Sequence, residues 1–490
     1  MDSIEKCLRI NASVPESGLY DGSYTYDGQR REVHSNTPWR ISPDPFFISD
    51  TDYAWLDNLG SHLLKFYQVC NMLYSQSVRK TQPAWIADYL DRGKPETVIE
   101  YGRMRRFKSQ LPQVIRPDIL PTDEGMVISE LDSVPGGIGF TGSLAVQYAA
   151  LDCDIVGGGN GMVVGFSEMI RSVANSEQPT LAIVVSDESE SYRQEMQWLA
   201  SELRHIGMSA YTVHPRQILF QELAGGKTGL FLDANTVTVS SENSAELDLI
   251  QIDVVYRFFE LFDLKNIPKS ELMLYAAKKR NVSMTPPPKA YLEEKQTFAL
   301  FHHPTLQPFW KRELGKETGK ILRQIIPETW VMDNRSLPPH ATIPNLLIQD
   351  LPITDFRQLS QISQKQRQLV IKPSGFSEHA WGARGVSIGH DMPTEDWSDT
   401  IETALDNFET SPHVLQKFYK SKQVRMPYYD FEKREMVMMR GRTLLRPYYF
   451  VTQNNQVRLS GIQAVICPDD KKILHGMVDA IIVPCAIWKK

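Results

Sequence analysis

The chain has 490 residues and a formal net charge of −6. This length exceeds what one ordinary hydrophobic core organises, so two to four sub-domains are expected. The acidic balance argues against a general nucleic-acid binder, which needs a basic face. Apolar residues make up 42% of the chain and charged residues 23%, which is the composition of a globular protein and excludes a disordered one.

The location of the protein is inferred from what the sequence lacks. No window approaches the roughly 18 uninterrupted apolar residues that a membrane span requires. The first residues show no basic segment followed by an apolar one, so no signal peptide is expected. The five cysteines are scattered and form no C-x-x-C pair, which favours reduced thiols. We therefore expect a cytoplasmic protein with neither membrane nor nucleic-acid partners, and the sequence leaves its oligomeric state open.

The N-terminal region, residues 1–112, is expected to be mostly helical. Its first 45 or so residues are polar and rich in Ser, Gly, Tyr and Pro, and we expect them to wrap the surface. Residues 50–90 follow the period of a packed helix, because apolar side chains recur at intervals of three and four. The members of this stripe are Leu56, Leu59, Leu63, Leu64 and Tyr67.

Residues 113–265 have a different sequence pattern, in which predicted strands and helices alternate as in an α/β unit. A strand over 181–185, a helix over 192–205 and a strand over 210–213 form a βαβ unit with a parallel sheet. Residues 249–255 are a further candidate buried strand. The sequence therefore predicts a Rossmann-like sub-domain after a short hairpin.

The remainder of the chain divides into two further regions. Residues 266–365 are predicted to be largely helical, with Thr285-Pro286-Pro287-Pro288 as a linker-like stretch. Residues 366–490 are predicted to be rich in strands. The fold class expected for the whole chain is α/β (α+β).

The hairpin at the start of the α/β unit has four charged residues in a regular pattern. Arg116 and Asp118 lie on one strand, and Glu130 and Asp132 lie on the next, after a turn at 122–125. Residues two apart on a strand point to the same face, so three carboxylates and a guanidinium can converge. Hard oxygen ligands of this kind suit Mg²⁺, which usually takes one or two carboxylates together with substrate phosphates. The alternative is an exposed hairpin with ordinary surface charges.

A second candidate site lies at the end of a predicted strand over 369–373. Lys372 ends this apolar run, and a buried lysine needs an anionic partner because an unpaired buried charge is costly. The glycines of the following loop allow a flap whose N–H groups face phosphate oxygens. They are Gly375, Gly382 and Gly385. The pattern is not a P-loop, and the alternative is a structural lysine beside a surface turn.

A third element is the strand over residues 413–418, which ends in the polar pair Gln416 and Lys417. These residues offer hydrogen-bond donors and acceptors to the edge of an adenine ring. The alternative is an ordinary edge strand.

Taken together, these segments resemble glutathionylspermidine synthetase and the related circularly permuted ATP-grasp proteins, from about Val114 to the C-terminus. The hairpin is similar to the family's metal-binding segment, which has the pattern Arg-x-Asp and then Glu-x-Asn. Here Arg116-Pro117-Asp118 precedes Glu130-Leu131-Asp132, and Glu130 lies twelve positions after Asp118. Leu292-Glu293-Glu294-Lys295 resembles the segment of the first ATP lysine, and the strand that ends at Lys372 resembles that of the second. The carboxylates precede the lysines, which is the permuted order.

The resemblance implies an ATP-grasp-like fold and an ADP-forming ligase that joins a carboxylate to an amine. In that reaction Asp118, Glu130 and Asp132 would bind Mg²⁺, and Arg116 would stabilise the transferring phosphoryl group. The ATP ligands implied are Lys295, Lys372, Gly375, Gly382, Gly385, Gln416 and Lys417. No Ser-His-Asp or Cys-His signature is evident, and an acyl-phosphate mechanism requires none.

Two other functions fit the same residues. Asp132 replaces the family's Asn and the flap is bulkier than usual, so a catalytically inactive nucleotide-binding scaffold is one alternative. An ATP-dependent kinase of a small molecule is the other. The chain lacks the amidase region of bifunctional glutathionylspermidine enzymes, so a polyamine substrate is not implied.

Overall fold

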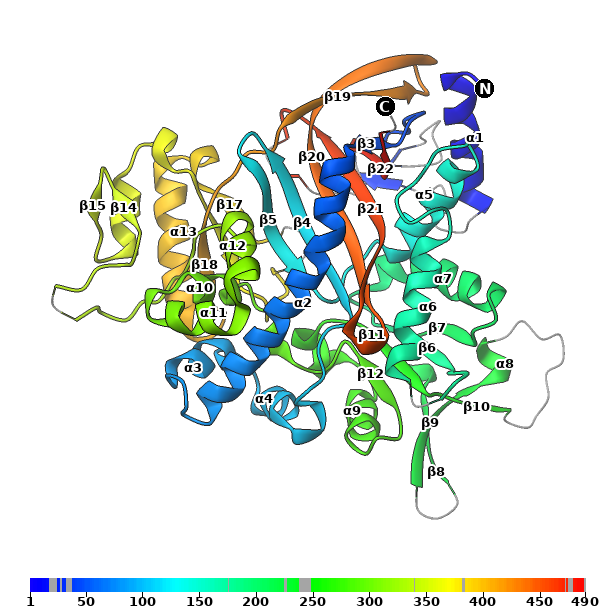
Figure 1. The fold of residues 1–490 in the computed structure, drawn as a ribbon, viewed down its shortest axis with the longest axis horizontal. Coiled ribbons are helices and arrows are strands. Elements are labelled where there is room, and N and C mark those ends of the chain that lie inside the picture. The colour runs from blue at the N-terminus through cyan, green and yellow to red at the C-terminus, as the bar shows by residue number, and fades with distance from the viewer. Residues whose placement is uncertain are drawn as a thin grey trace.

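The computed structural model is built from three principal sheets with helices packed around them (Figure 1). It describes residues 1–16, 24–26, 29–31, 38–174, 176–223, 227–237, 248–338, 340–380, 384–471, 473–474 and 479–488. Among the described helices, none is both long and apolar enough to cross a membrane. All five cysteines are free thiols.

The largest sheet is antiparallel over most of its width and has the strand order β3-β22-β21-β20-β4-β5, with β19 paired to β20. Its strands are β3 (Phe46–Ile48), β4 (Val114–Thr122), β5 (Gly125–Asp132), β19 (Gln423–Asp430), β20 (Glu435–Val451), β21 (Val457–Pro468) and β22 (Ile481–Ile487). The first and last parts of the chain therefore meet in one sheet.

The N-terminal region is helical, as predicted. Its helices are α1 (Ser3–Glu16), α2 (Asp50–Val78), α3 (Trp85–Asp91) and α4 (Glu96–Arg103). The apolar stripe of α2 is buried at all five predicted positions. This helix crosses the large sheet, where Tyr449 donates a hydrogen bond to the Leu56 carbonyl oxygen at 2.6 Å. Gly60 permits the contact, because a Cβ there would lie 2.5 Å from the Tyr449 ring.

The chain begins with a helix, α1, that the polar composition did not predict. Cys7, Ile10 and Val14 are buried at intervals of three and four, so α1 packs through a narrow apolar stripe. Short strands β1 (Tyr24–Tyr26) and β2 (Gln29–Arg31) follow.

The predicted βαβ unit is confirmed. β6 (Leu181–Val185) and β7 (Ala210–Val213) are parallel neighbours connected through α7 (Arg193–His205). The sheet has the order β12-β11-β6-β7 and is covered on both faces. Leu181, Ile183 and Val185 pack into one core cluster, whereas Ala182 and Val184 pack into another. This alternation is the two-residue period of a buried parallel strand.

The predicted strand over residues 249–255 is wrong in extent, because two strands occupy this region. β10 (Leu249–Gln251) joins β8 (Leu219–Leu223) and β9 (Lys227–Asp233) in a separate antiparallel sheet, and β11 (Val254–Phe258) joins the parallel one. Asp253 lies at the break, where its carboxylate accepts a hydrogen bond from the Thr180 backbone N–H at 2.9 Å. A polar side chain that binds a neighbouring backbone separates the two strands.

The third sheet is antiparallel and has the order β13-β18-β16-β17. Its strands are β13 (Thr329–Val331), β16 (Leu369–Pro373), β17 (Ser387–Ile388) and β18 (His413–Lys417). Helix α13 (Thr394–Asp406) packs against it through Trp397, Ile401 and Leu405. Because β18 lies between β13 and β16, the alternative of an ordinary edge strand at 413–418 is wrong.

The proline-rich stretch at residues 285–288 is not an exposed linker. It follows β12 (Ser283–Thr285), contains a cis peptide bond between Thr285 and Pro286, and is buried throughout. Arg257, itself fully buried, donates to the Pro286 carbonyl oxygen at 3.4 Å. The prolines therefore belong to the interior and lead directly to the segment that contains Lys295.

The remaining helices complete the covering of the sheets. They are α5 (Ile138–Ala149), α6 (Gly161–Val173), α8 (Ala234–Val237), α9 (Ser270–Lys278), α10 (Gln296–His302), α11 (Gln307–Leu314) and α12 (Lys316–Ile325). Figure 1 shows α5, α6 and α7 gathered on one side of the molecule and the α13 lobe on the other. A small hairpin of β14 (Leu347–Ile348) and β15 (Leu351–Pro352) extends from that lobe.

Candidate active site

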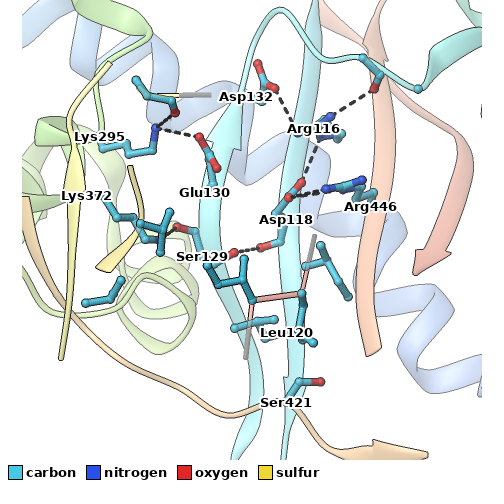
Figure 2. Close-up of a pocket in the computed structure, with 18 of the residues that line it drawn as sticks. Arg116, Asp118, Leu120, Ser129, Glu130, Asp132, Lys295, Lys372, Ser421 and Arg446 are labelled. Atoms are coloured by element: carbon cyan, nitrogen blue, oxygen red, sulfur yellow. Dashed lines mark hydrogen bonds and ion pairs between the residues drawn. The ribbon is translucent and has the colours of Figure 1, made fainter. Parts of the chain in front are cut away.

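A cavity of about 580 Å³ lies between the β4–β5 hairpin, the third sheet and the end of β11. This volume is within the usual range for a small-molecule site. The sequence-predicted residues that line it are Arg116, Asp118, Glu130, Asp132, Lys295, Lys372, Gln416 and Lys417. Their side chains come from segments far apart in the sequence (Figure 2).

The predicted hairpin is confirmed, and its four charged residues face the same cavity. Arg116 pairs in register with Asp132, and Asp118 pairs with Glu130. Gly125 ends the turn with φ +131°, a conformation that L side chains rarely adopt. The alternative of an exposed hairpin with ordinary surface charges is therefore wrong, because Arg116 and Asp118 are buried.

A register shift follows Asp118, because Ile119 pairs with Ile128 and leaves Ser129 as the extra residue. This irregularity is a β-bulge, which re-aims groups of the bulged strand. The Ser129 hydroxyl donates to the Asp118 carbonyl oxygen at 3.2 Å, and the Ser129 carbonyl oxygen accepts from the Lys372 Nζ at 3.1 Å. The bulge thereby connects the hairpin to the lysine of the third sheet.

Arg116 is held by carboxylates on both sides. Its guanidinium lies 3.1 Å from Asp118 Oδ1 and 3.0 Å from Asp132 Oδ2, and it donates to the Gly136 carbonyl oxygen at 3.1 Å. Burial opposes the charge, but Asp118 and Asp132 raise the pKa of Arg116 well above its ordinary value. Arg446 of β20 approaches Asp118 Oδ2 at 3.3 Å. The two arginines therefore balance the carboxylate charge in this part of the cavity.

Lys295 joins the hairpin to the flap. It precedes α10, and its Nζ lies 2.8 Å from Glu130 Oε1 and donates to the Ala380 carbonyl oxygen at 2.9 Å. Burial would lower the pKa of Lys295, but Glu130 raises it above the ordinary value. The lysine is therefore charged when the site is empty of substrate, and its counter-ion is one of the predicted metal ligands.

Lys372 is held mainly by neutral oxygens. Its Nζ donates to the Ser129 carbonyl oxygen and, at 3.0 Å, to Gln416 Oε1. Burial lowers the pKa of Lys372 to about 8, although Glu130 opposes the shift. The Gln416 amide nitrogen in turn donates to the Thr329 hydroxyl at 3.2 Å. Gln416 thus orients Lys372, and a bound phosphate would give this lysine the full counter-charge that it lacks here.

The described glycines of the flap serve close packing. A Cβ at Gly375 would lie 2.5 Å from the Glu293 carbonyl oxygen, and a Cβ at Gly385 would lie 2.6 Å from the Pro373 ring. Gly375 therefore lets the end of β16 pack directly against the segment before Lys295. Gly382 lies outside the described residues.

Two further residues of the cavity gave no recognisable sequence signal. Glu195 of α7 accepts hydrogen bonds from the backbone N–H groups of Gly137 (2.7 Å) and Phe140 (3.0 Å) at the start of α5. Burial raises the pKa of Glu195 to about 7, although the N–H groups oppose the shift. Glu195 therefore occupies the N-terminus of α5, and its carboxylate satisfies backbone N–H groups there. Glu260, which follows β11, also lines the cavity.

The acidic residues of the cavity suit a metal ion that is bound jointly by carboxylates and by the phosphate oxygens of a substrate. Within the ranges that the structure describes, no three acidic, His or Cys side chains are close enough to form a metal site alone. The side chains of Glu130 and Asp132 are nevertheless 36% and 30% exposed toward the cavity. Mg²⁺ usually takes one or two carboxylates plus substrate phosphates and water. This donor set therefore fits Mg²⁺ bound together with a nucleotide.

Comparison with solved structures identifies the fold. The chain is similar to a glutathione synthetase-like effector from Globodera pallida, in its apo form, with a TM-score of 0.56 over 100% of this chain and 98% of that chain, at 9% identity. A putative γ-glutamylcysteine synthetase from Methylobacillus flagellatus KT matches more loosely, with a TM-score of 0.37, 12% identity and coverage of 86% and 84%. No protein-family model matches the chain, and no curated protein matches its sequence.

The chain therefore has the α/β ATP-grasp-like fold that the sequence predicted. More particularly, its fold is similar along its full length to that of the glutathione synthetase-like effector. The specific likeness to glutathionylspermidine synthetase stays a prediction.

Proposed function

We propose that this protein is an ADP-forming, Mg-ATP-dependent ligase that joins a carboxylate to an amine. The proposal rests on one observation: two lysines and an acidic hairpin, from three separate segments, converge on a single cavity. Lys295 and Lys372 supply positive charge for phosphate oxygens, and the hairpin supplies oxygen ligands. The shared fold agrees with this assignment but does not by itself define a reaction.

In the proposed reaction the two lysines bind the ATP phosphates, and Asp118, Glu130 and Asp132 would hold Mg²⁺. The ion would neutralise phosphate charge as it develops. Arg116 stabilises the transferring phosphoryl group from its fixed position. A substrate carboxylate oxygen attacks the γ-phosphorus and ADP leaves. The amine then attacks the resulting acyl phosphate, and inorganic phosphate leaves.

The chain's contribution is positioning and electrostatics, and the reaction needs no protein nucleophile. In agreement, none of the five cysteines lines the cavity. Burial raises the pKa of Cys7 to about 12 and raises that of Cys485 as well, so neither thiol is activated. The cytoplasmic location and the carboxylate and amine partners are part of this proposal.

Hydroxylamine tests the proposal, because it intercepts an acyl phosphate as a hydroxamate. We expect the protein, incubated with Mg-ATP, hydroxylamine and a pool of amino acids and dipeptides, to release ADP and form hydroxamate in parallel. ADP release without hydroxamate would favour the kinase alternative. AMP with pyrophosphate would contradict the proposal, and nucleotide binding without turnover would favour an inactive scaffold.

A further inference from the structure

One end of the cavity lies at the carboxyl ends of the parallel strands β6 and β11. Ser189 and Ser191 follow β6, and Glu260 follows β11; all three line the cavity. In open parallel sheets, ligands bind in the crevice outside the carboxyl ends of the strands. Lys372, the proposed phosphate ligand, comes instead from the third sheet. The parallel sheet therefore offers room for a second substrate beside the nucleotide.

Glu260 is open to this end of the cavity and has no direct partner there. It is half-buried, and its carboxylate makes no hydrogen bond or ion pair with another described residue. Both carboxylate oxygens are open to the cavity, since neither is a buried atom. By contrast, Glu195 accepts two backbone N–H groups, and Asp132 pairs with Arg116. Glu260 is thus an anion that is available to a ligand.

The charges around Glu260 favour a cation beside it. Burial is the main cause that raises the pKa of Glu260 to about 8, and the carboxylates of Glu293 and Asp132 raise it as well. Arg257 and Lys295 oppose the shift, but they pair with Glu293 and Glu130 rather than with Glu260. A cationic ligand would supply the counter-charge that Glu260 lacks in the free protein.

The wall beside Glu260 is aromatic. Tyr192 and Phe258 line the same end of the cavity, with ring centroids 5.6 Å apart in an edge-to-face arrangement. Apolar walls lower the local dielectric constant and strengthen an ion pair formed against them. Aromatic faces also attract ammonium groups. A substrate carboxylate would be repelled by Glu260, so this end suits the amine and not the acid.

We propose that Glu260 binds the ammonium group of the amine substrate and then accepts one of its protons. The inference rests on the proposed function, because it requires an acyl phosphate in the same cavity. Asp132 and Lys295 are both close enough to Glu260 to act on its pKa. An ammonium group bound there therefore lies beside the proposed phosphoryl site. The substrate class is an amine that arrives as a cation.

The proton must be removed because an ammonium nitrogen has no lone pair. The ammonium group gives one proton to the Glu260 carboxylate, and the freed lone pair forms the C–N bond with the acyl carbon. The C–O bond to phosphate then breaks, and the phosphate leaves with the second proton from the nitrogen. A carboxylate whose pKa is raised toward the working pH is suited to act as such a base.

A comparison of two nucleophiles tests the inference, because hydroxylamine is neutral where primary amines are ammonium ions. The pool of amino acids and dipeptides supplies the carboxylates and, through its α-amino groups, the ammonium ions. Hydroxamate is measured with hydroxylamine present, and amide products are measured by mass spectrometry without it. We expect Glu260→Gln to lose amide formation by about a hundredfold, the scale of a general base, and to form hydroxamate within about twofold of the wild-type rate.

Two further variants control the experiment. Glu260→Asp keeps the charge and should retain part of the amide formation. Glu190→Gln is the matched control, because Glu190 lies in the turn after β6 with its side chain 58% exposed and paired with Arg193. This variant should form both products as the wild-type chain does.

The failure of this inference differs from the failure of the proposed function. A wild-type chain that forms neither hydroxamate nor amide would overturn both. Wild-type levels of amide from Glu260→Gln would overturn the role of Glu260 alone. An equal loss of hydroxamate and amide would also overturn it, because the effect would then not concern the amine. Hydroxamate without amide from the wild-type chain would overturn the assignment of a cationic amine.

Discussion

Replacing Lys372 with methionine should weaken ATP binding by about 1.5–3 kcal/mol, the scale of a lost hydrogen bond to a charged group. This corresponds to roughly a ten- to hundredfold loss of affinity. The buried Nζ donates to two neutral oxygens and has no ion pair of its own among the described residues. Methionine is unbranched and only one atom shorter than lysine, so the fold should survive the change. Calorimetry would measure the effect, and unchanged nucleotide affinity would move the phosphate site elsewhere.

The same lysine gives ATP binding a pH dependence. Burial lowers the pKa of Lys372 to about 8, so the free protein loses this charge as pH rises through about 8. Wild-type ATP affinity should fall above that pH, whereas Lys372→Arg should show a flatter profile because arginine stays charged. The folded-state pKa lies below the unfolded value of about 10.5, so the unfolded chain binds more protons between these values. The contribution of Lys372 to the free energy of unfolding therefore rises with pH between these two pKa values. Deprotonation of Lys372 does not unfold the protein in this range, so unfolding would not explain the loss of ATP affinity.

Replacing Glu130 with glutamine should abolish Mg-dependent ATP turnover and leave the fold nearly intact. Burial opposes ionisation, but Lys295 lowers the pKa of Glu130, so the carboxylate is charged at neutral pH. Its side chain is 36% exposed toward the cavity, and it forms an ion pair with Lys295. Glutamine preserves the shape and removes the charge that a divalent cation requires. We expect at least a hundredfold loss of turnover, the scale of one electrostatic group in a catalytic site.

The control for this variant is Glu124→Gln, the same substitution in the exposed turn of the same hairpin. It should leave turnover and melting temperature unchanged. A Glu130→Gln protein with full Mg-dependent turnover would contradict the metal assignment. A large drop in melting temperature would instead indicate that the Glu130–Lys295 pair serves mainly the fold.

The hairpin could be predicted from sequence because strand periodicity is local. A two-residue period and a turn were enough to place Arg116, Asp118, Glu130 and Asp132 on one face. Lys372 could be predicted because a lysine that ends an apolar strand needs a partner. The βαβ unit followed from its own alternation of patterns.

The rest depended on contacts between distant segments. The ion pair between Lys295 and Glu130 joins positions from two separate regions, and nothing near either residue indicates it. Arg446 reaches Asp118 only because β20 and β4 are neighbours in the large sheet. The bulge at Ser129 has no glycine to mark it. The prolines at 285–288 suggest a linker by composition, but tertiary packing buries them.

The most direct test of the central claim is the fate of a carboxylate oxygen. If the carboxylate attacks the γ-phosphorus, one of its oxygens leaves with inorganic phosphate when the amine displaces it. The substrates are a pool of amino acids and dipeptides labelled with ¹⁸O in the carboxylate, which the protein turns over with Mg-ATP and an amine. We expect ³¹P NMR to show that the released phosphate contains one ¹⁸O atom. Unlabelled phosphate accompanying amide formation would contradict activation of the carboxylate by ATP.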